Sequence, residues 1–258
     1  MENNSLVKKL VTILDAIIGK KLSKSNKILF GIDLYWLIIG KRLSLLIDHY
    51  YLTQQEFSNL IRKLKTLNSN LIGLSLNDDF NFILISEYFE ELKNFKDLRI
   101  IDCSPSLKSS ELIKNESDIV SNFKEEFSKL VKSSEESKDL ILPFEEIQQA
   151  FVVSITGYLL NYPVIYYNDN TGDSNYLDNC LNGVDLNVYK FIAKLWSSEY
   201  LITSFSIPNS LETDNLSQAI EKWKLNLENF DLNLKLDEGK GWNFLLIRKL
   251  SNWIKFVY

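Results

Sequence analysis

The chain has 258 residues, of which 45% are hydrophobic and 24% charged, a balance that excludes a disordered or fibrous protein. Its formal net charge is −5, and its basic residues are interspersed with acidic ones rather than gathered along one stretch. A nucleic-acid-binding surface needs clustered positive charge, so nucleic acid is not expected as a partner.

Residues 5–22 carry apolar side chains at helical spacing and predict an amphipathic helix. The N-terminal stretch has no uniform apolar core with a small-residue cleavage site, so it does not resemble a secretory signal. The longest apolar runs, residues 28–39 and 151–167, are interrupted by polar residues and are short for a membrane span. We therefore expect a protein of the cytoplasm or nucleus that is not secreted.

Two short apolar runs in the first half have the composition of buried strands. They are residues 27–33 and 98–103, and each closes on an acid, Asp33 in the first and Asp102 in the second. If the two strands are parallel neighbours, both carboxylates lie on the rim where ligands collect in α/β sheets.

The elements between these runs are helical or hairpin-like. Residues 34–51 show neither helical nor strand period, and we expect a loop leading into a helix from Leu43. Thr53 and Glu56 form a capping-box pattern that opens a further helix. Residues 71–86 hold two apolar runs around a polar turn, which predicts a hairpin. This alternation predicts a sheet covered by helices.

The second half begins with residues 105–139, rich in Ser, Lys and Glu, which we expect to form a helix on the surface. Pro143 is typical of a first helical turn and predicts a helix from that residue. Residues 187–196 and 200–207 alternate as an antiparallel pair of strands, and residues 231–258 suggest a meander.

These patterns predict an α/β fold with a mixed parallel and antiparallel sheet flanked by helices. We expect a single domain over residues 1–258, with the alternative of two closely packed halves. The halves are residues 1–104 and 140–258, joined by the helical segment 105–139.

Few residues of the sequence match known patterns of catalytic or metal-binding side chains. His49 is the single histidine, so a Ser-His-Asp triad, a Cys-His dyad or a multi-histidine zinc site has one imidazole at most. Phosphate-loop, dinucleotide-binding and nucleophile-elbow motifs do not occur. The two cysteines, Cys103 and Cys180, are expected to be reduced thiols, because the chain carries no secretory signal.

Asp33 and Asp102 are the candidate catalytic or metal-ligating residues, because strand-end carboxylates can hold a divalent cation or act as a base. The alternative is a structural role, since an Asp after a strand often caps the next backbone amide. Asp169, Asp173 and Asp178 share one loop, but their spacing does not match the calcium-loop pattern. No cofactor is predicted, and a divalent cation enters only with the catalytic alternative.

The C-terminal third is aromatic. Core packing explains most of this, and a patch that binds a protein partner is the alternative. The residues concerned are Trp223, Trp242, Phe244, Trp253, Phe256 and Tyr258.

Three stretches resemble an uncharacterised eukaryotic protein family that includes a human protein named only as a chromosome 1 open reading frame. They are GYLLNYPVIYY at residues 157–167, NCLNGVDLNVYKFIA at 179–193 and YLITSFSIPNSL at 200–211. The chain departs from the family pattern at Asn161, where a glycine is expected. The first run, ILFGID, keeps the acid Asp33 without the cysteine that follows it in the family. The resemblance implies no activity and assigns no functional residue.

The sequence therefore leaves the function open. The first hypothesis is a non-catalytic intracellular interaction or scaffold protein, favoured by the sparse catalytic inventory and the aromatic C-terminal third. The alternative is a metal-assisted hydrolase or phosphotransfer enzyme that uses Asp33 and Asp102, so enzymatic activity stays uncertain with the balance against it.

Overall fold

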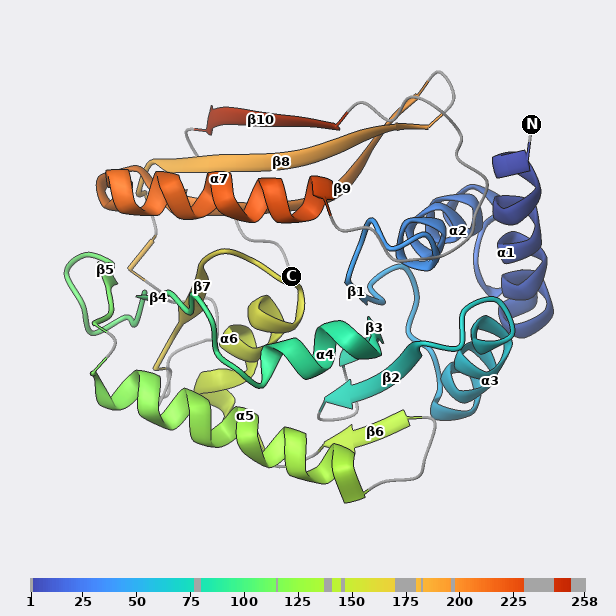
Figure 1. Ribbon diagram of the computed structural model, residues 1–258, viewed down its shortest axis with the longest axis horizontal. Coiled ribbons are helices and arrows are strands. Elements are labelled where there is room, and N and C mark those ends of the chain that lie inside the picture. The colour runs from blue at the N-terminus through green and yellow to red at the C-terminus, as the bar shows by residue number, and fades with distance from the viewer. Residues whose placement is uncertain are drawn as a thin grey trace. The chain divides into compact units, whose positions relative to one another are not determined.

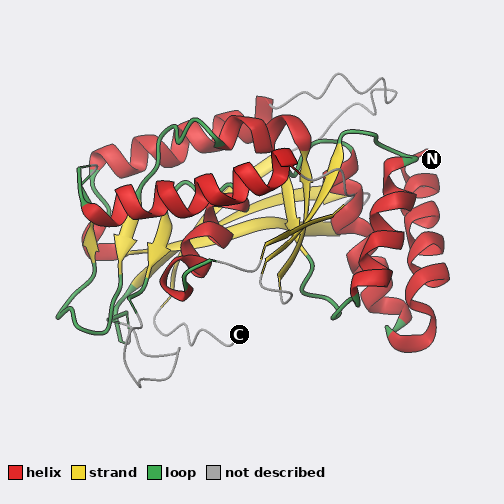
Figure 2. Ribbon diagram, turned by 90° about the horizontal axis from the view of Figure 1, so that it is seen from below, coloured by secondary structure: helices red, strands yellow, loops and turns green. Residues whose placement is uncertain are grey.

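The chain forms two compact units. In a computed structural model, the first unit comprises Met1–Asn94, Ser128–Ile147 and Phe230–Lys235, and the second comprises Phe95–Phe127, Gln148–Asn229 and Leu236–Tyr258. The structure describes residues 2–76, 80–114, 116–136, 141–144, 147–169, 180–181, 183–195, 198–229 and 244–251. Helices and strands both contribute to the described chain (Figure 2), which confirms the predicted α/β class.

The first unit begins with two helices packed against each other. Helix α1 spans Glu2–Ile18, the short 3-10 helix η1 spans Gly19–Lys21, and α2 spans Lys24–Ile38. A β-carbon added at Gly31 of α2 would lie 3.0 Å from Cγ2 of Val11 in α1. The missing side chain at this position therefore allows the two helices to approach closely.

The strand predicted over residues 27–33 is wrong, because these residues lie in the middle of α2. The side chain of Ser23 caps the helix by accepting a hydrogen bond from the Asn26 amide at 3.2 Å. From Phe30 to Ile38 nearly every side chain is buried, so the helix is apolar on all faces and has no visible period. The helix predicted from Leu43 is also wrong, because Ser44–Leu46 form strand β1.

The remaining elements of the first unit build a mixed sheet. Its order is β1-β3-β2-β6 (Figure 1). The predicted hairpin is confirmed, since β2 and β3 pair antiparallel, and the predicted capping box at the start of α3 is confirmed as well. The bounds are Gln54–Lys65 for α3, Leu71–Leu76 for β2, Phe80–Ile85 for β3, Ser86–Leu92 for α4 and Ile141–Phe144 for β6.

Pro143 lies in strand β6 rather than at the start of a helix, so that prediction is wrong. Strand β6 pairs with β2 in parallel and is the last strand in the order of the sheet. An edge strand tolerates proline because one side of the strand forms no ladder hydrogen bonds. The helix that follows, α6, spans Gln149–Leu159 in the second unit.

In its described residues, the second unit has two three-stranded sheets. One has the order β5-β4-β7, with β4 parallel to β7, and the other has the order β10-β8-β9 and is antiparallel. The predicted strand pair over residues 187–207 is confirmed as β8 and β9. The bounds are Glu111–Leu112 for β5, Ile100–Asp102 for β4, Ile165–Tyr167 for β7, Leu186–Leu195 for β8, Ser198–Pro208 for β9 and Phe244–Ser251 for β10.

Helix α7, Asp214–Asn229, lies along the β10-β8-β9 sheet (Figure 1). Trp223 of α7 is buried, and its ring meets Phe205 of β9 at 5.1 Å and Phe191 of β8 at 6.2 Å between centroids. The 3-10 helix η2, Asn209–Leu211, connects β9 with the segment before α7. One face of α7 is thereby fixed on the sheet.

A cluster of aromatic rings forms another part of the core of the second unit. Helix α5, Asp118–Glu136, contributes Phe123 and Phe127, and α6 contributes Tyr158. Phe95 packs against all three, with centroid distances of 6.3, 5.6 and 6.1 Å. The helix predicted within residues 105–139 is therefore confirmed as α5, and its side chains Phe123 and Phe127 are buried.

Candidate binding site

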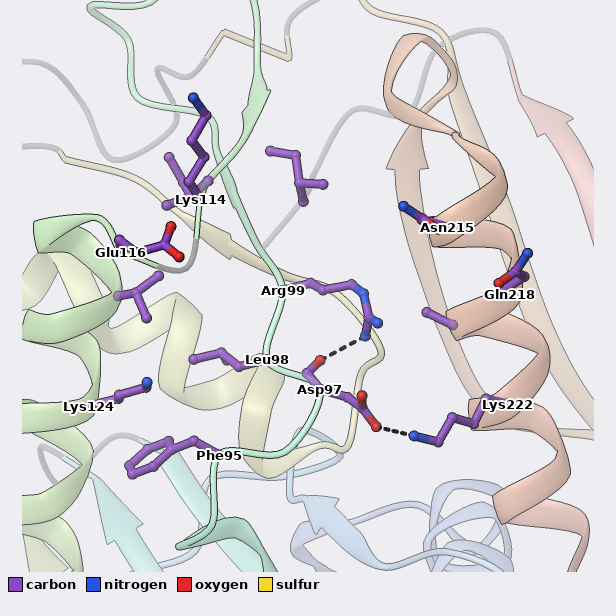
Figure 3. Close-up of a pocket in the computed structure, with 14 residues that line it drawn as sticks. Phe95, Asp97, Leu98, Arg99, Lys114, Glu116, Lys124, Asn215, Gln218 and Lys222 are labelled. Carbon is purple, nitrogen blue, oxygen red and sulfur yellow. Dashed lines mark hydrogen bonds and ion pairs between the residues drawn. The ribbon is translucent and has the colours of Figure 1, made fainter.

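A cavity of about 840 Å³ opens in the second unit between the start of α5 and α7. Its walls come from the loop at residues 95–99, from residues 112–116 and from the two helices (Figure 3). We call it the α5–α7 groove. Its polar lining consists of four cations, two acids and two amides: Arg99, Lys114, Lys124, Lys222, Asp97, Glu116, Asn215 and Gln218.

Helix α7 presents Asn215, Gln218 and Lys222 to the groove. These positions lie three and four residues apart, so they share one face of the helix. The adjoining face of the helix carries Trp223, which packs against the sheet. The fixed orientation of α7 therefore holds its exposed amide and ammonium groups at the groove.

Asp97 lies between Arg99 and Lys222. Its Oδ2 atom is 2.5 Å from Nζ of Lys222, and its backbone carbonyl accepts a hydrogen bond of 2.8 Å from Nη1 of Arg99. The hydrogen bond from Lys222 holds the pKa of Asp97 below its ordinary value. Because both partners of the ion pair are more than half exposed, the pair adds little to stability.

The loop that carries Arg99 has an unusual backbone. Phe95 and Asp97 have φ angles of 49° and 56°, a left-handed conformation that is uncommon for non-glycine residues and rare for a bulky one such as Phe95. The aromatic cluster around Phe95 holds the loop in this conformation. Sparsely populated backbone conformations concentrate at functional sites, where the surrounding structure maintains them.

The two sides of the loop differ in chemistry. Arg99 points towards α7, whereas Leu98 points towards α5 (Figure 3). On the α5 side, Nζ of Lys124 lies 5.9 Å from the centroid of the Phe95 ring, within the range of a cation–π contact. The α7 side of the groove thus offers hydrogen-bond donors for an anion, and the α5 side adds apolar surface.

Asp33 is not at the end of a strand, because it lies within α2 of the first unit. Its Oδ1 accepts from Nη1 of Arg42 at 2.7 Å, and its Oδ2 lies 2.6 Å from Nε2 of His49. The His49 ring also stacks on buried Phe30 at 5.2 Å. Asp33 therefore joins α2 to the segment around β1.

Asp102 ends strand β4 in the second unit, as predicted. It is buried, and its Oδ1 accepts from the backbone amide of Ser104 at 2.8 Å and from the Ser104 hydroxyl at 2.5 Å. The hydroxyl in turn accepts from the amide of Asp169 at 2.8 Å. These are the bonds of an Asp that caps the turn after a strand.

Asp33 and Asp102 thus belong to different units. Within the described residues, no group of three or more His, Cys, Asp or Glu side chains could hold a metal ion.

Asp173 and Asp178 of the calcium-like loop lie outside the described residues, as do Trp242 and Trp253 of the aromatic C-terminal third. No helix in the part of the chain that the structure describes has the length and apolarity needed to cross a bilayer.

Sequence reasoning missed the α5–α7 groove. Residues 97–99 and 215–222 are far apart in the chain, and no motif links them. The available signal was the polar face of α7 at positions 215, 218 and 222, beside its apolar stripe. That pattern marks an exposed face on any surface helix and does not by itself indicate a site.

Residues 13–242 match the model of the family described as "Domain of unknown function (DUF4504)". The chain belongs to this family. The prediction that the chain belongs to an uncharacterised family is thereby confirmed. Comparison with curated proteins and with solved structures gave no match.

The matched range of this DUF4504 chain includes Asp33, Asp102 and every residue that lines the α5–α7 groove. The family description assigns no activity, ligand or partner. The physical properties of the groove therefore carry the functional argument.

Proposed function

We propose that this DUF4504 protein is a non-catalytic interaction protein that binds an acidic segment of a partner protein in the α5–α7 groove. The observation that carries the proposal is the position of Arg99 and Lys222 on either side of Asp97, next to the amides of Asn215 and Gln218. Guanidinium, ammonium and amide groups together are donors suited to carboxylates.

Charge supports an acidic ligand. The whole chain carries a net charge of −5, yet the groove has four basic residues against two acids. The net negative charge of the protein repels acidic segments, whereas the basic residues of the α5–α7 groove attract them. The Arg99 fork has further N–H donors beyond the one that binds the Asp97 carbonyl, so it can receive a carboxylate while the loop stays in place.

Apolar residues of the groove support a peptide rather than a small anion. Leu98, Leu112 and Val120 belong to the lining together with the charged residues. A peptide that alternates acidic and apolar side chains can contact both kinds of surface, whereas inorganic phosphate or citrate contacts only the donors.

The test is a binding measurement by fluorescence anisotropy with a labelled glutamate-rich peptide that carries interspersed leucines. We expect saturable binding that weakens as salt increases, because exposed charges are screened. A lysine-rich peptide of the same length should not bind, and citrate and inorganic phosphate should not compete at comparable concentrations. Equal binding of both peptides, or full competition by the small anions, would overturn the proposal.

Point variants test whether the acidic peptide binds in the α5–α7 groove. Arg99→Gln should weaken it by about tenfold, because the bidentate donor is lost. Asp97→Asn should strengthen it by about fivefold, because the competing carboxylate is removed while Asn tolerates the left-handed backbone. The matched control is Lys108→Gln, an exposed lysine of the second unit outside the groove lining, which should leave affinity unchanged.

A second candidate function is a metal-assisted hydrolase or phosphotransfer enzyme that uses Asp102 with Asp33. The observation that favours it is the position of Asp102 at the carboxyl end of β4, beside its parallel neighbour β7. The test is the shift of Tm on adding Mg²⁺ or Mn²⁺. A shift that is lost in both Asp33→Asn and Asp102→Asn would support this candidate, and its absence in the unaltered protein would reject it.

The cellular location and the domain organisation are further parts of the proposal. We propose a cytoplasmic or nuclear protein of eukaryotic cells, in which residues 1–258 act as a single α/β domain, with the halves 1–104 and 140–258 as the alternative. The aromatic C-terminal third remains a proposed second partner surface, although Trp223 is a buried member of it. Fractionation of cells that express a tagged chain tests the location, and recovery in secreted material would reject it.

A further inference from the structure

The two cysteines of the chain are neighbours in the second unit. The backbone amide of Cys180 donates a hydrogen bond of 3.0 Å to the backbone carbonyl of Cys103. The chain contains no further cysteine, so the fold brings both of its cysteines next to each other. Spacing in the sequence gave no indication of this pairing.

The backbone contact meets the geometric requirement for a disulfide. A backbone N–H···O=C hydrogen bond of 3.0 Å brings the Cα atoms of its two residues within about 5–6.5 Å of each other. Disulfides need a Cα separation of about 4.4–6.8 Å. The separation of the two backbones therefore permits a bridge between Cys103 and Cys180.

Cys103 is held firmly at this position. Its backbone amide donates to the carbonyl of Tyr167 at 2.9 Å, and its thiol donates to the same carbonyl at 3.1 Å. Loss of the thiol hydrogen therefore leaves the Tyr167 carbonyl with a partner. A disulfide at Cys103 does not create an unsatisfied buried acceptor.

The two thiols differ in accessibility. Cys103 is buried, whereas Cys180 is half-buried. Burial raises the pKa of Cys103 to about 12, and burial also raises the pKa of Cys180, with a further contribution from Asp102. Both residues are thus thiols at neutral pH, and their oxidation is slow unless the oxidant is abundant or the pH is high.

We propose that Cys103 and Cys180 form an intramolecular disulfide by exchange with a small-molecule disulfide of the oxidised-glutathione class. The Cys180 thiolate attacks one sulfur of oxidised glutathione, which forms a mixed disulfide and releases one glutathione thiolate. The Cys103 thiol loses its proton, and its sulfur then attacks the sulfur of Cys180 and releases the second glutathione. The net change oxidises two protein thiols to one disulfide and reduces oxidised glutathione to two glutathione molecules.

The disulfide closes a long stretch of chain, so it stabilises the folded protein relative to the unfolded chain. It ties the end of β4 to residue 180, at the place where Asp169 and Cys180 both bond to the consecutive residues Cys103 and Ser104. This site is separate from the α5–α7 groove, since neither cysteine lines the groove.

The test is incubation of the full chain with oxidised glutathione at pH 8, followed by alkylation and mass spectrometry under non-reducing conditions. We expect a monomer that has lost the mass of two hydrogen atoms and a proteolytic fragment in which the peptides of Cys103 and Cys180 are joined. The Tm should rise by about 5–10 °C and return on reduction.

Three outcomes would overturn the proposal. They are alkylation of both thiols after long incubation, a stable glutathione adduct on Cys180 with Cys103 still free, and a disulfide-linked dimer. The variant Cys180→Ser provides the control, because it should show neither the joined peptides nor the rise in Tm. The measurement on the unaltered chain stands even where a variant folds poorly.

Discussion

Nε2 of His49 lies 2.6 Å from Oδ2 of Asp33, and both side chains are half-buried. The hydrogen bond to Asp33 raises the pKa of His49 above its ordinary value, although burial and Arg42 oppose the shift. The folded state therefore binds the proton of His49 more tightly than the unfolded chain does. The contribution of the contact to stability is complete below the unfolded pKa and is lost as the pH rises through the folded pKa.

We predict that the free energy of unfolding of the unaltered protein decreases as the pH rises above about 6.5. His49→Gln should be less stable at pH 6 and should lack this decrease. Chemical denaturation at a series of pH values measures both. Because the chain has one histidine, a variant that keeps the same pH dependence would disprove the role of this pair.

The aromatic cluster of the second unit predicts a large loss on truncation. Phe123 is fully buried, and its ring lies 5.4 Å from Tyr158 and 6.3 Å from Phe127. Phe123→Ala should lower the free energy of unfolding by about 3–5 kcal/mol. Leu225→Ala removes an exposed side chain of the same unit and should change it by less than about 0.5 kcal/mol. Similar losses in both variants would contradict the packing.

The close approach of α1 and α2 at Gly31 predicts coupling with Val11. Gly31→Ala should destabilise the protein, because the added carbon meets Cγ2 of Val11 at 3.0 Å. In a Val11→Ala background the clash is relieved, and the same change should stabilise by up to about 1 kcal/mol through helix propensity. A double-mutant cycle by chemical denaturation measures the coupling. Additive effects would show that the side chains around Gly31 move to accommodate the added carbon without cost.

The capping box of α3 predicts a difference between two conservative variants. Thr53 Oγ1 accepts from the Glu56 amide at 3.2 Å, and Glu56 Oε2 accepts from the Thr53 amide at 3.0 Å. Thr53→Ala should cost about 1 kcal/mol, whereas Thr53→Ser keeps the acceptor and should cost much less. Thermal unfolding of the two variants makes the comparison, and equal losses would exclude a capping role.

Local patterns predicted the elements whose stability comes from neighbouring residues. The capping box at Thr53, the hairpin over residues 71–86 and the pair β8–β9 depend on side chains close in sequence. Residues 27–33 were assigned wrongly because burial on all faces of α2 removes the period that distinguishes a helix from a strand.

The sequence by itself determined the α/β class, the family, the scarcity of catalytic side chains and the acid at the end of β4. Tertiary structure alone decided that Asp33 pairs with His49, that Cys103 meets Cys180 and that Arg99 faces α7. The physical reason is the same in each case. These contacts join residues of different elements, from 16 residues apart for Asp33 and His49 to more than 100 for Arg99 and α7. Their geometry depends on how the helices and strands pack, and local sequence patterns do not contain that information.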